Sequence, residues 1–359
     1  MDAPLSHIEK SLSTALKSEI QLAKCTKFKK KRIFRCWVAD GPNSLPEVFL
    51  VKMARHTERE PYNRESDCVG SPAWKFFNEW AALQFLSQIG STRTLAPQFI
   101  AGDAIQGLIA FEYVPKARSF RDILRNANEN EQRRALLTYA QTMGRMHGVT
   151  YGRQTEWLRL RTSLGTFHQE DTGLFDGILR TFRRLATLVQ QPVPAAVETE
   201  LSELKDMLSD AERFSAFRHV DIAPQNYLLL DDGVKLVDFE YSDYGHFLLD
   251  APLGPYPFSV RWECDEVLTR EIENVYRAEL SSGFPGALDD SIYYKGVLTA
   301  WIYWLLRLGP VPRTHTNTIK VADALAGRCK AVARLSHEIE YLPRIGRIFA
   351  QVAILHENQ

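Results

Sequence analysis

The stretch that decides the fold runs from His219 to Glu240 and reads HVDIAPQNYLLLDDGVKLVDFE. Two apolar runs, YLLL and VKLV, flank the turn-forming residues Asp-Asp-Gly, and this pattern predicts a β-hairpin. Asn226 directly precedes the first predicted strand, and Asp238 directly follows the second. The two ends of an antiparallel hairpin lie side by side, so we expect the carboxamide of Asn226 and the carboxylate of Asp238 to converge there.

A third polar group belongs to the same region. Asp221 lies five residues before Asn226, on the loop that leads into the hairpin. Carboxylate and amide oxygens suit Mg²⁺ better than a softer metal. The sequence therefore predicts that Asn226 and Asp238 bind Mg²⁺ with Asp221 nearby. The alternative is a hairpin whose flanks are simply polar.

Composition narrows the class of protein. The chain has 359 residues, of which 45% are hydrophobic and 25% charged, which is typical of a globular protein long enough for two lobes. The formal net charge is zero, which gives no argument for nucleic acid or a membrane as a partner. The longest apolar stretch, Val297–Leu306, is too short to cross a bilayer.

Five scattered cysteines include no C-x-x-C pair, which predicts neither a zinc site nor a disulfide framework. That usage fits a reducing compartment. The N-terminal residues lack the features of a secretory signal, so we expect a cytoplasmic protein. Nothing in the sequence indicates an oligomeric state.

The chain changes character along its length. Segments rich in β-formers dominate the first part, and AWKFFNEWAALQFLSQIG, from Ala73, has apolar residues at helical spacing. From Ser119 onward most of the pattern is helical. We therefore predict an α+β, two-lobed fold. Residues 1–114 would form a small lobe of β-sheet with one long helix, and residues 115–359 a larger, mostly helical lobe.

This order of elements, together with two motifs, resembles the protein-kinase-like superfamily, and within it the aminoglycoside phosphotransferase and choline kinase group. His219, Asp221 and Asn226 spell H-x-D-x-x-x-x-N, and Asp238 begins the later motif D-F-E. The resemblance implies a protein-kinase-like fold that uses ATP and Mg²⁺. It implies that Asp221 orients the acceptor hydroxyl and takes its proton, while Asn226 and Asp238 hold Mg²⁺ against the phosphates.

The same resemblance implies four further nucleotide-binding residues. Lys52, in FLVKM, resembles the lysine that reaches the phosphates of the nucleotide. Glu79 resembles its ion-pair partner; Glu65 competes for that role, but Glu79 lies inside the predicted helix. The segment AFEYVP resembles the hinge between the lobes, where backbone groups of Glu112 and Val114 would bond the edge of adenine.

Two positions depart from the family pattern. The turn TKFKKKR, residues 26–32, contains five cations and no glycine, whereas relatives usually have small residues there. These cations either contact phosphates or form a solvated hairpin tip. Val220 stands where many relatives have Gly or Asn, which bears on the backbone freedom of its loop.

The expected phosphate acceptor is a hydroxyl group of a small molecule. Only eleven residues separate Asp238 from Asp250, too few for a segment that docks a peptide. Acidic candidates for binding a polycation are Glu263, Asp265, Glu266, Asp289 and Asp290. Aromatic candidates for binding a quaternary ammonium are Tyr293, Tyr294, Trp301, Tyr303 and Trp304. Both acceptor classes stay open, and the alternative function is a catalytically inactive, nucleotide-binding scaffold of kinase fold.

Overall fold

The computed structural model describes residues 5–28, 30–66, 68–90, 95–167, 174–191, 193–210, 213–231, 233–251, 266–308 and 318–357. The chain divides into two compact units. Unit 1 comprises residues 1–135, 153–170 and 219–243, and unit 2 comprises residues 136–152, 171–218 and 244–359. The lobe boundary after residue 114, which the sequence suggests, stays a prediction.

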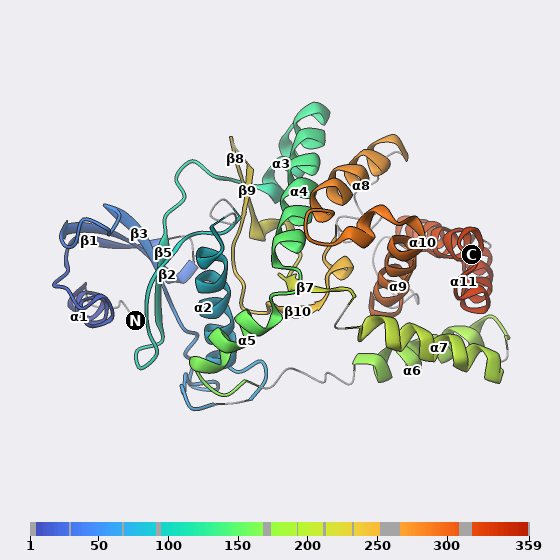
Figure 1. Ribbon diagram of the computed structural model, residues 1–359, viewed down its shortest axis with the longest axis horizontal. Helices are drawn as coiled ribbons and strands as arrows, with labels where there is room; N and C mark the ends of the chain where they lie inside the picture. The colour runs from blue at the N-terminus through green and yellow to red at the C-terminus, as the bar shows by residue number, and fades with distance from the viewer. Residues whose placement is uncertain are drawn as a thin grey trace. The chain divides into compact units, whose positions relative to one another are not determined.

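Unit 1 contains a five-stranded antiparallel sheet formed by the N-terminal part of the chain (Figure 1). Its strand order is β1-β2-β3-β5-β4. Its strands are β1 (Gln21–Phe28), β2 (Lys30–Asp40), β3 (Val48–Met53), β4 (Phe99–Asp103) and β5 (Leu108–Glu112). The register places Ile33 opposite Lys52 across β2 and β3. The small N-terminal sheet predicted from the sequence is confirmed.

Helix α1 (Leu5–Leu16) covers one face of this sheet. Its Ile8 and Leu12 are fully buried in a cluster with Phe49 and Val51 of β3. Burying such apolar side chains is the main term that holds a short helix on a sheet, because an isolated helix of this length is marginal in water. This helix was not predicted from the sequence.

Helix α2 (Pro72–Gln88) is the long helix predicted for the first part of the chain, and it lies on the other side of the sheet (Figure 1). It begins at Ser71, whose hydroxyl accepts a hydrogen bond of 3.2 Å from the backbone N–H of Trp74. Proline at the first helical position has no N–H to leave unsatisfied, so Pro72 suits this start.

A second, three-stranded sheet of unit 1 carries the predicted hairpin. Its order is β6-β8-β9, with β6 (Arg118–Ser119), β8 (Tyr227–Leu230) and β9 (Gly233–Leu236). Register pairs Tyr227 with Leu236 and Leu229 with Val234. The hairpin is therefore confirmed, but its second strand begins and ends one residue earlier than predicted, so Val237 lies between the strand and Asp238. The rest of unit 1 includes α3 (Phe120–Asn126), α5 (Gln154–Ser163) and the short 3-10 helix η2 (Pro224–Asn226).

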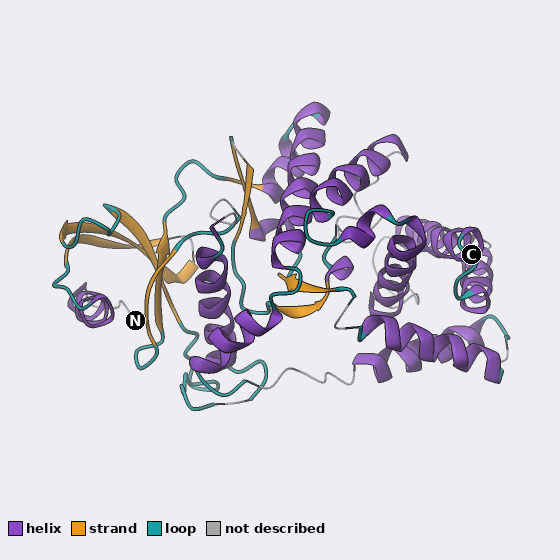
Figure 2. Ribbon diagram, viewed as in Figure 1, coloured by secondary structure: helices purple, strands orange, loops and turns teal. Residues whose placement is uncertain are grey.

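Unit 2 is mostly helical, as Figure 2 shows. Its helices are α4 (Glu129–Thr150, whose first residues belong to unit 1), α6 (Leu174–Leu188), α7 (Ala195–Leu208), α8 (Glu266–Leu280), α9 (Asp290–Leu308), α10 (Thr318–Glu338) and α11 (Pro343–Glu357). Shorter elements are β7 (Ser215–Arg218), β10 (Asp243–His246), η3 (Phe247–Leu249) and η4 (Pro285–Leu288). The predicted α+β class, with a helix-rich later part, is confirmed. Within the described residues, every helix is too short or too polar to cross a lipid bilayer.

Candidate active site

Strand alternation brings Lys52 to the site. Successive side chains of a strand point to opposite faces of the sheet. In β3, Phe49 and Val51 point into the cluster under α1, so Lys52 points to the other face, toward α2. The lysine is only 5% exposed. A buried ammonium group requires nearby negative charge, because its desolvation is otherwise very costly.

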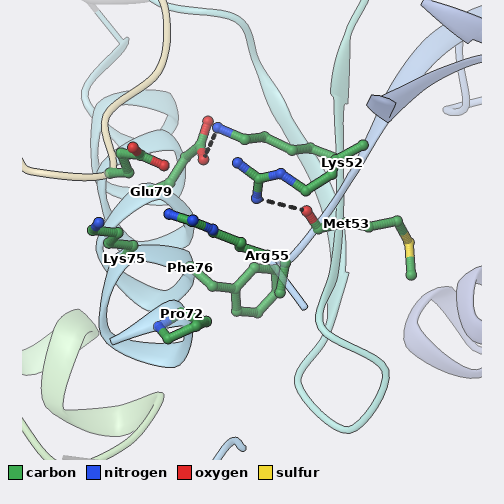
Figure 3. A pocket seen from close by; sticks show the side chains of 10 residues that line it. Lys52, Met53, Arg55, Pro72, Lys75, Phe76 and Glu79 are labelled. Carbon is green, nitrogen blue, oxygen red and sulfur yellow. Dashed lines mark hydrogen bonds and ion pairs between the residues drawn. The ribbon is translucent and has the colours of Figure 1, made fainter. Parts of the chain in front are cut away.

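Two carboxylates supply that charge. Lys52 Nζ lies 2.5 Å from Glu79 Oε2 and 2.6 Å from Asp238 Oδ1. Glu79 comes from the middle of α2 and is itself only 4% exposed. In Figure 3 the side chains of Lys52 and Glu79 extend toward one another and meet beside the helix. The structure therefore brings together three residues that the sequence analysis singled out from three separate segments.

The electrostatic balance keeps this lysine charged. Burial by itself lowers the pKa of Lys52, but the carboxylates of Glu79 and Asp238 outweigh burial and raise the pKa above its ordinary value. Burial raises the pKa of Glu79, while the charge of Lys52 opposes that rise. The ammonium group of Lys52 therefore stays positively charged although it is almost completely buried.

Hydrogen bonds at the open end of the β8–β9 hairpin fix the loop that contains Asp221 and Asn226. The backbone N–H of Val237 donates to the carbonyl of Asn226 at 2.9 Å, which joins the two strand ends. The Nδ2 of Asn226 donates to the carbonyl of Asp221 at 3.1 Å, and Asn226 is buried. The carboxamide therefore ties the loop that carries Asp221 to the base of the hairpin, while the Asp221 residue stays half-buried.

His219 fixes the start of the same loop. Its Nε2 lies 2.9 Å from the carbonyl oxygen of Val237, and its ring lies 4.7 Å from the ring of Phe239. The imidazole is fully buried, so this contact makes Nε2 the protonated nitrogen. The geometry gives His219 a scaffolding role, because it anchors the loop of Asp221 to the end of the hairpin.

Two non-glycine residues in this region have left-handed backbone conformations. Val220 has φ 68° and Asp238 has φ 70°. A β-branched residue is strongly disfavoured there, and such strain concentrates at functional sites. Val220, which stands where relatives often have Gly or Asn, thus occupies a position where those residues would be less strained.

Asn226 and Asp238 have the chemistry of a magnesium site completed by phosphates. The described residues contain no group of three or more His, Cys, Asp or Glu side chains placed to hold a metal ion. Mg²⁺ in phosphate-transferring enzymes, however, takes one or two carboxylates and completes its shell with phosphate oxygens and water. The amide of Asn226 uses its nitrogen for Asp221, which leaves the amide oxygen as a ligand. Asp238 carries a second carboxylate oxygen besides the one at Lys52.

The proposed hinge residues show a more specific arrangement than the sequence indicated. The backbone N–H of Glu112 already donates to the carbonyl of Gln98 at 2.9 Å, so only the carbonyl of Glu112 remains for adenine. The Glu112 side chain contacts Lys235 Nζ at 2.5 Å and accepts from the Gln98 N–H at 3.0 Å. This link from β9 to the end of β5 was not predicted from the sequence. Val114 follows β5 and is half-buried.

A small pocket of about 50 Å³ adjoins Lys52 and Glu79 (Figure 3). Further charged residues that line it, and that the sequence analysis did not assign to the site, are Arg55, Lys75 and Glu240. From the basic turn, Arg32 lines this pocket, and its Nη1 donates to the carbonyl of Met53 at 3.3 Å. Lys29 and the side chains of Lys30 and Lys31 lie outside the described part of the chain, so the role of the turn in phosphate binding stays a prediction.

Unit 2 contains a separate cavity of about 640 Å³ between α8, α9 and α10. The acceptor-binding candidates that line it are Glu266, Asp290, Tyr294 and Trp301, and the structure adds Glu273 and Glu338. Other candidates do not line it: Tyr293 is fully buried, and Trp304 Nε1 donates to the carbonyl of Leu249 at 2.9 Å. Glu263 and Asp265 lie outside the described residues.

Comparison with known protein families finds one match. Residues 71–256, just over half of the chain, match the model of the phosphotransferase enzyme family, APH. No curated protein matches the chain.

Similar solved structures include choline kinase LicA from Streptococcus pneumoniae, with 14% identity, 92% of this chain and 98% of that chain covered, and a TM-score of 0.43. Choline kinase from Cryptosporidium parvum Iowa II has 13% identity, with 90% of each chain covered and a TM-score of 0.43. Amicoumacin kinase hAmiN has 14% identity, with 94% of this chain and 93% of that chain covered and a TM-score of 0.46. Identities this low carry nothing about the substrate.

Proposed function

Because the chain belongs to the phosphotransferase enzyme family, we propose that it transfers the γ-phosphoryl group of ATP, with Mg²⁺, to a hydroxyl group of a small molecule. The observation that carries this proposal is the buried group of Lys52, Glu79 and Asp238 beside the loop of Asp221 and Asn226. Phosphoryl transfer depends on positioning and on charge neutralisation, and these are the properties of this group.

Lys52 would bind the phosphates as a permanent cation, because its neighbours raise its pKa. Glu79 would keep the ammonium group in place from α2. Mg²⁺ would be held by the Asn226 amide oxygen and by Asp238, and when bound it neutralises phosphate charge. Adenine would be recognised by the Glu112 carbonyl and the Val114 N–H, an acceptor and a donor that match the edge of the base.

Asp221 would orient the acceptor hydroxyl and take its proton. Its backbone is held at both ends: its N–H donates to the carbonyl of His219 at 2.9 Å, and its carbonyl accepts from Asn226 at 3.1 Å. A fixed backbone and a half-buried side chain suit a general base that must stay open to a substrate.

The charge of the unit 2 cavity supports an acceptor that carries one ammonium group. Three of its carboxylates have arginine partners: Glu266 with Arg270 at 3.8 Å, Asp290 with Arg277 at 2.6 Å, and Glu338 with Arg334 at 3.7 Å. Glu273 is hydrogen-bonded to Tyr294, but its Oε1 is buried without a partner among the described residues. Burial also raises the pKa of Glu273, and a ligand cation beside it would offset that cost. Tyr294 and Trp301 add aromatic faces for cation–π contact.

The test is ATP consumption with a panel of choline, ethanolamine, aminoglycosides and sugar alcohols. We expect turnover with at least one amine acceptor, and we expect Asp221→Asn to lower kcat by about a hundredfold or more at an unchanged ATP dissociation constant. Glu273→Gln should raise the KM of the amine acceptor and leave the KM of ATP unchanged. Mg²⁺-dependent ATP binding without consumption across the panel would favour the inactive scaffold instead.

A further inference from the structure

Two cysteines whose spacing forms no sequence motif lie side by side in the sheet of unit 1. Cys25 in β1 lies directly opposite Cys36 in β2, and their Sγ atoms are 3.5 Å apart. Directly opposed residues of antiparallel strands have Cα separations of about 4.5 or 5.5 Å. Both values fall within the range of about 4.4–6.8 Å that a disulfide bond tolerates. Closing the bond to about 2.05 Å therefore requires side-chain movement of about 1.5 Å and no change of register.

The surroundings give the two thiols different roles. β1 is an edge strand, and Cys25 is half-buried. Cys36 is fully buried in the apolar cluster that includes Ile8 and Leu12 of α1. An oxidant from solvent therefore reaches Cys25 first, and Cys36 is held at contact distance behind it.

The two thiols also differ in reactivity. The hydrogen bond from the Cys36 thiol lowers the pKa of Cys25, so the thiolate form of Cys25 is favoured. The same hydrogen bond and burial raise the pKa of Cys36. A thiolate is the nucleophile in thiol oxidation, which makes Cys25 the attacking sulfur and Cys36 the resolving one.

We propose that Cys25 and Cys36 are a reversible oxidation site that forms a cross-strand disulfide on exposure to a hydroperoxide. The Cys25 thiolate attacks one oxygen of hydrogen peroxide, the O–O bond breaks, and hydroxide leaves and becomes water after protonation. The Cys36 sulfur then attacks the Cys25 sulfenic acid, an S–S bond forms, and a second water leaves with the Cys36 proton. Two thiols thus lose two electrons and two protons, and one peroxide is reduced to two water molecules. A dithiol reductant reverses the change.

The disulfide would link the edge strand β1 covalently to β2. β2 pairs with β3, which carries Lys52, and the β1–β2 hairpin also carries the basic turn. A cross-link limits the unfolded chain, so oxidation should make unit 1 harder to unfold. This inference stands independently of the proposed function, because it concerns the face of the sheet away from Lys52.

The test treats the full chain with excess hydrogen peroxide, quenches in acid, and alkylates free thiols with N-ethylmaleimide under denaturing conditions. Trypsin then cuts after Lys24, Lys27, Arg35 and Lys52, which isolates Cys25 in residues 25–27 and Cys36 in residues 36–52. We expect these two peptides to appear cross-linked, with alkylation lost at both cysteines and restored by dithiothreitol. We also expect a higher Tm after oxidation, reversed by the same reductant.

Two variants serve as controls. Cys68 is exposed, so Cys68→Ser should leave the cross-link unchanged. Cys25→Ser should abolish it, keep Cys36 fully alkylated and remove the shift in Tm. The proposal is overturned if both cysteines of the wild type remain alkylated after peroxide. It is equally overturned if Cys25 pairs with Cys68 or proceeds to sulfinic acid instead of pairing with Cys36.

Discussion

Lys52 is a buried cation whose two partners come from segments far apart in the chain. Glu79 lies in a helix and Asp238 follows a hairpin, at 2.5 and 2.6 Å from the same nitrogen. Removing one partner of a buried ion pair leaves an uncompensated charge, so these three residues depend on one another. The Lys52–Glu79 pair was predicted from the sequence through its resemblance to a known family. It could not predict the direct contact between Lys52 and Asp238, because that distance depends on how the two sheets of unit 1 meet.

Val220 provides a test of backbone strain at the residue scale. Its φ of 68° is costly for a β-branched side chain, by about 1–3 kcal/mol. Glycine adopts this conformation freely but loses about 0.5–1 kcal/mol through its more flexible unfolded chain. We therefore expect Val220→Gly to raise the free energy of unfolding by roughly 1 kcal/mol, measured by urea denaturation.

The matched control is Val220→Ala. Alanine shortens the side chain but keeps the Cβ that disfavours the left-handed conformation. It should therefore gain less stability than Val220→Gly, or none. Equal stability of the two variants would mean that backbone strain is not what Val220 contributes.

At the scale of elements, the Lys235–Glu112 contact ties the hairpin to the strand end that leads into the proposed hinge. The two charged groups are 2.5 Å apart, with Lys235 mostly buried and Glu112 about one-third exposed. We expect a double-mutant cycle with Lys235→Met and Glu112→Gln to give a coupling energy of about 1 kcal/mol in urea unfolding. A coupling near zero would show that each side chain stabilises its own strand independently.

The elements differ in how far the sequence predicted them. The hairpin was predictable because a turn sequence separates two short β-forming runs, and α2 because its apolar residues recur at helical spacing up to Gly90. α1 was not predicted, since its stability comes from Ile8 and Leu12 on a sheet that the sequence does not reveal. The Cys25–Cys36 pair was missed for a related reason: strand register decides it, and no spacing motif signals it.

At the scale of the molecule, buried histidines make unit 2 sensitive to acid. His246 is stacked on Phe214 at 4.7 Å, and burial followed by the charge of Arg218 lowers its pKa to about 3. The unfolded chain takes up a proton near pH 6.5, so the stability that neutral His246 contributes is present above that pH and is lost as the pH falls toward 3. We expect His246→Phe to resist acid better, with a stability advantage that grows by about 1.4 kcal/mol per pH unit below 6.5.

Urea unfolding at several pH values between 7.5 and 4.5 measures this difference. His147, whose pKa is also lowered to about 3 by burial, remains in both proteins and gives them a common background slope. Parallel pH profiles for wild type and variant would show that the pKa of His246 is the same in the folded and unfolded protein, and would contradict this account.

The unit 2 cavity shows the limit of sequence reasoning at this scale. The acidic and aromatic candidates looked like two competing acceptor classes. The structure places Glu266, Asp290, Tyr294 and Trp301 around one cavity, because they occupy the facing sides of α8 and α9. Glu273 was not singled out, since a glutamate within an ordinary amphipathic helix gives no signal that its oxygen is buried without a partner in the described part of the chain.

The most direct test of the account is calorimetric ATP binding with Mg²⁺ and with a chelator, for wild type, Asp238→Asn and Asp231→Asn. Asparagine tolerates the left-handed backbone at position 238, so this variant removes charge without adding strain. Asp231 is an exposed carboxylate at the opposite end of the same hairpin. We predict that Mg²⁺ tightens ATP binding by about tenfold or more, or about 1.4 kcal/mol, in wild type and Asp231→Asn but not in Asp238→Asn. Undiminished Mg²⁺ dependence in Asp238→Asn would contradict the assignment of this site.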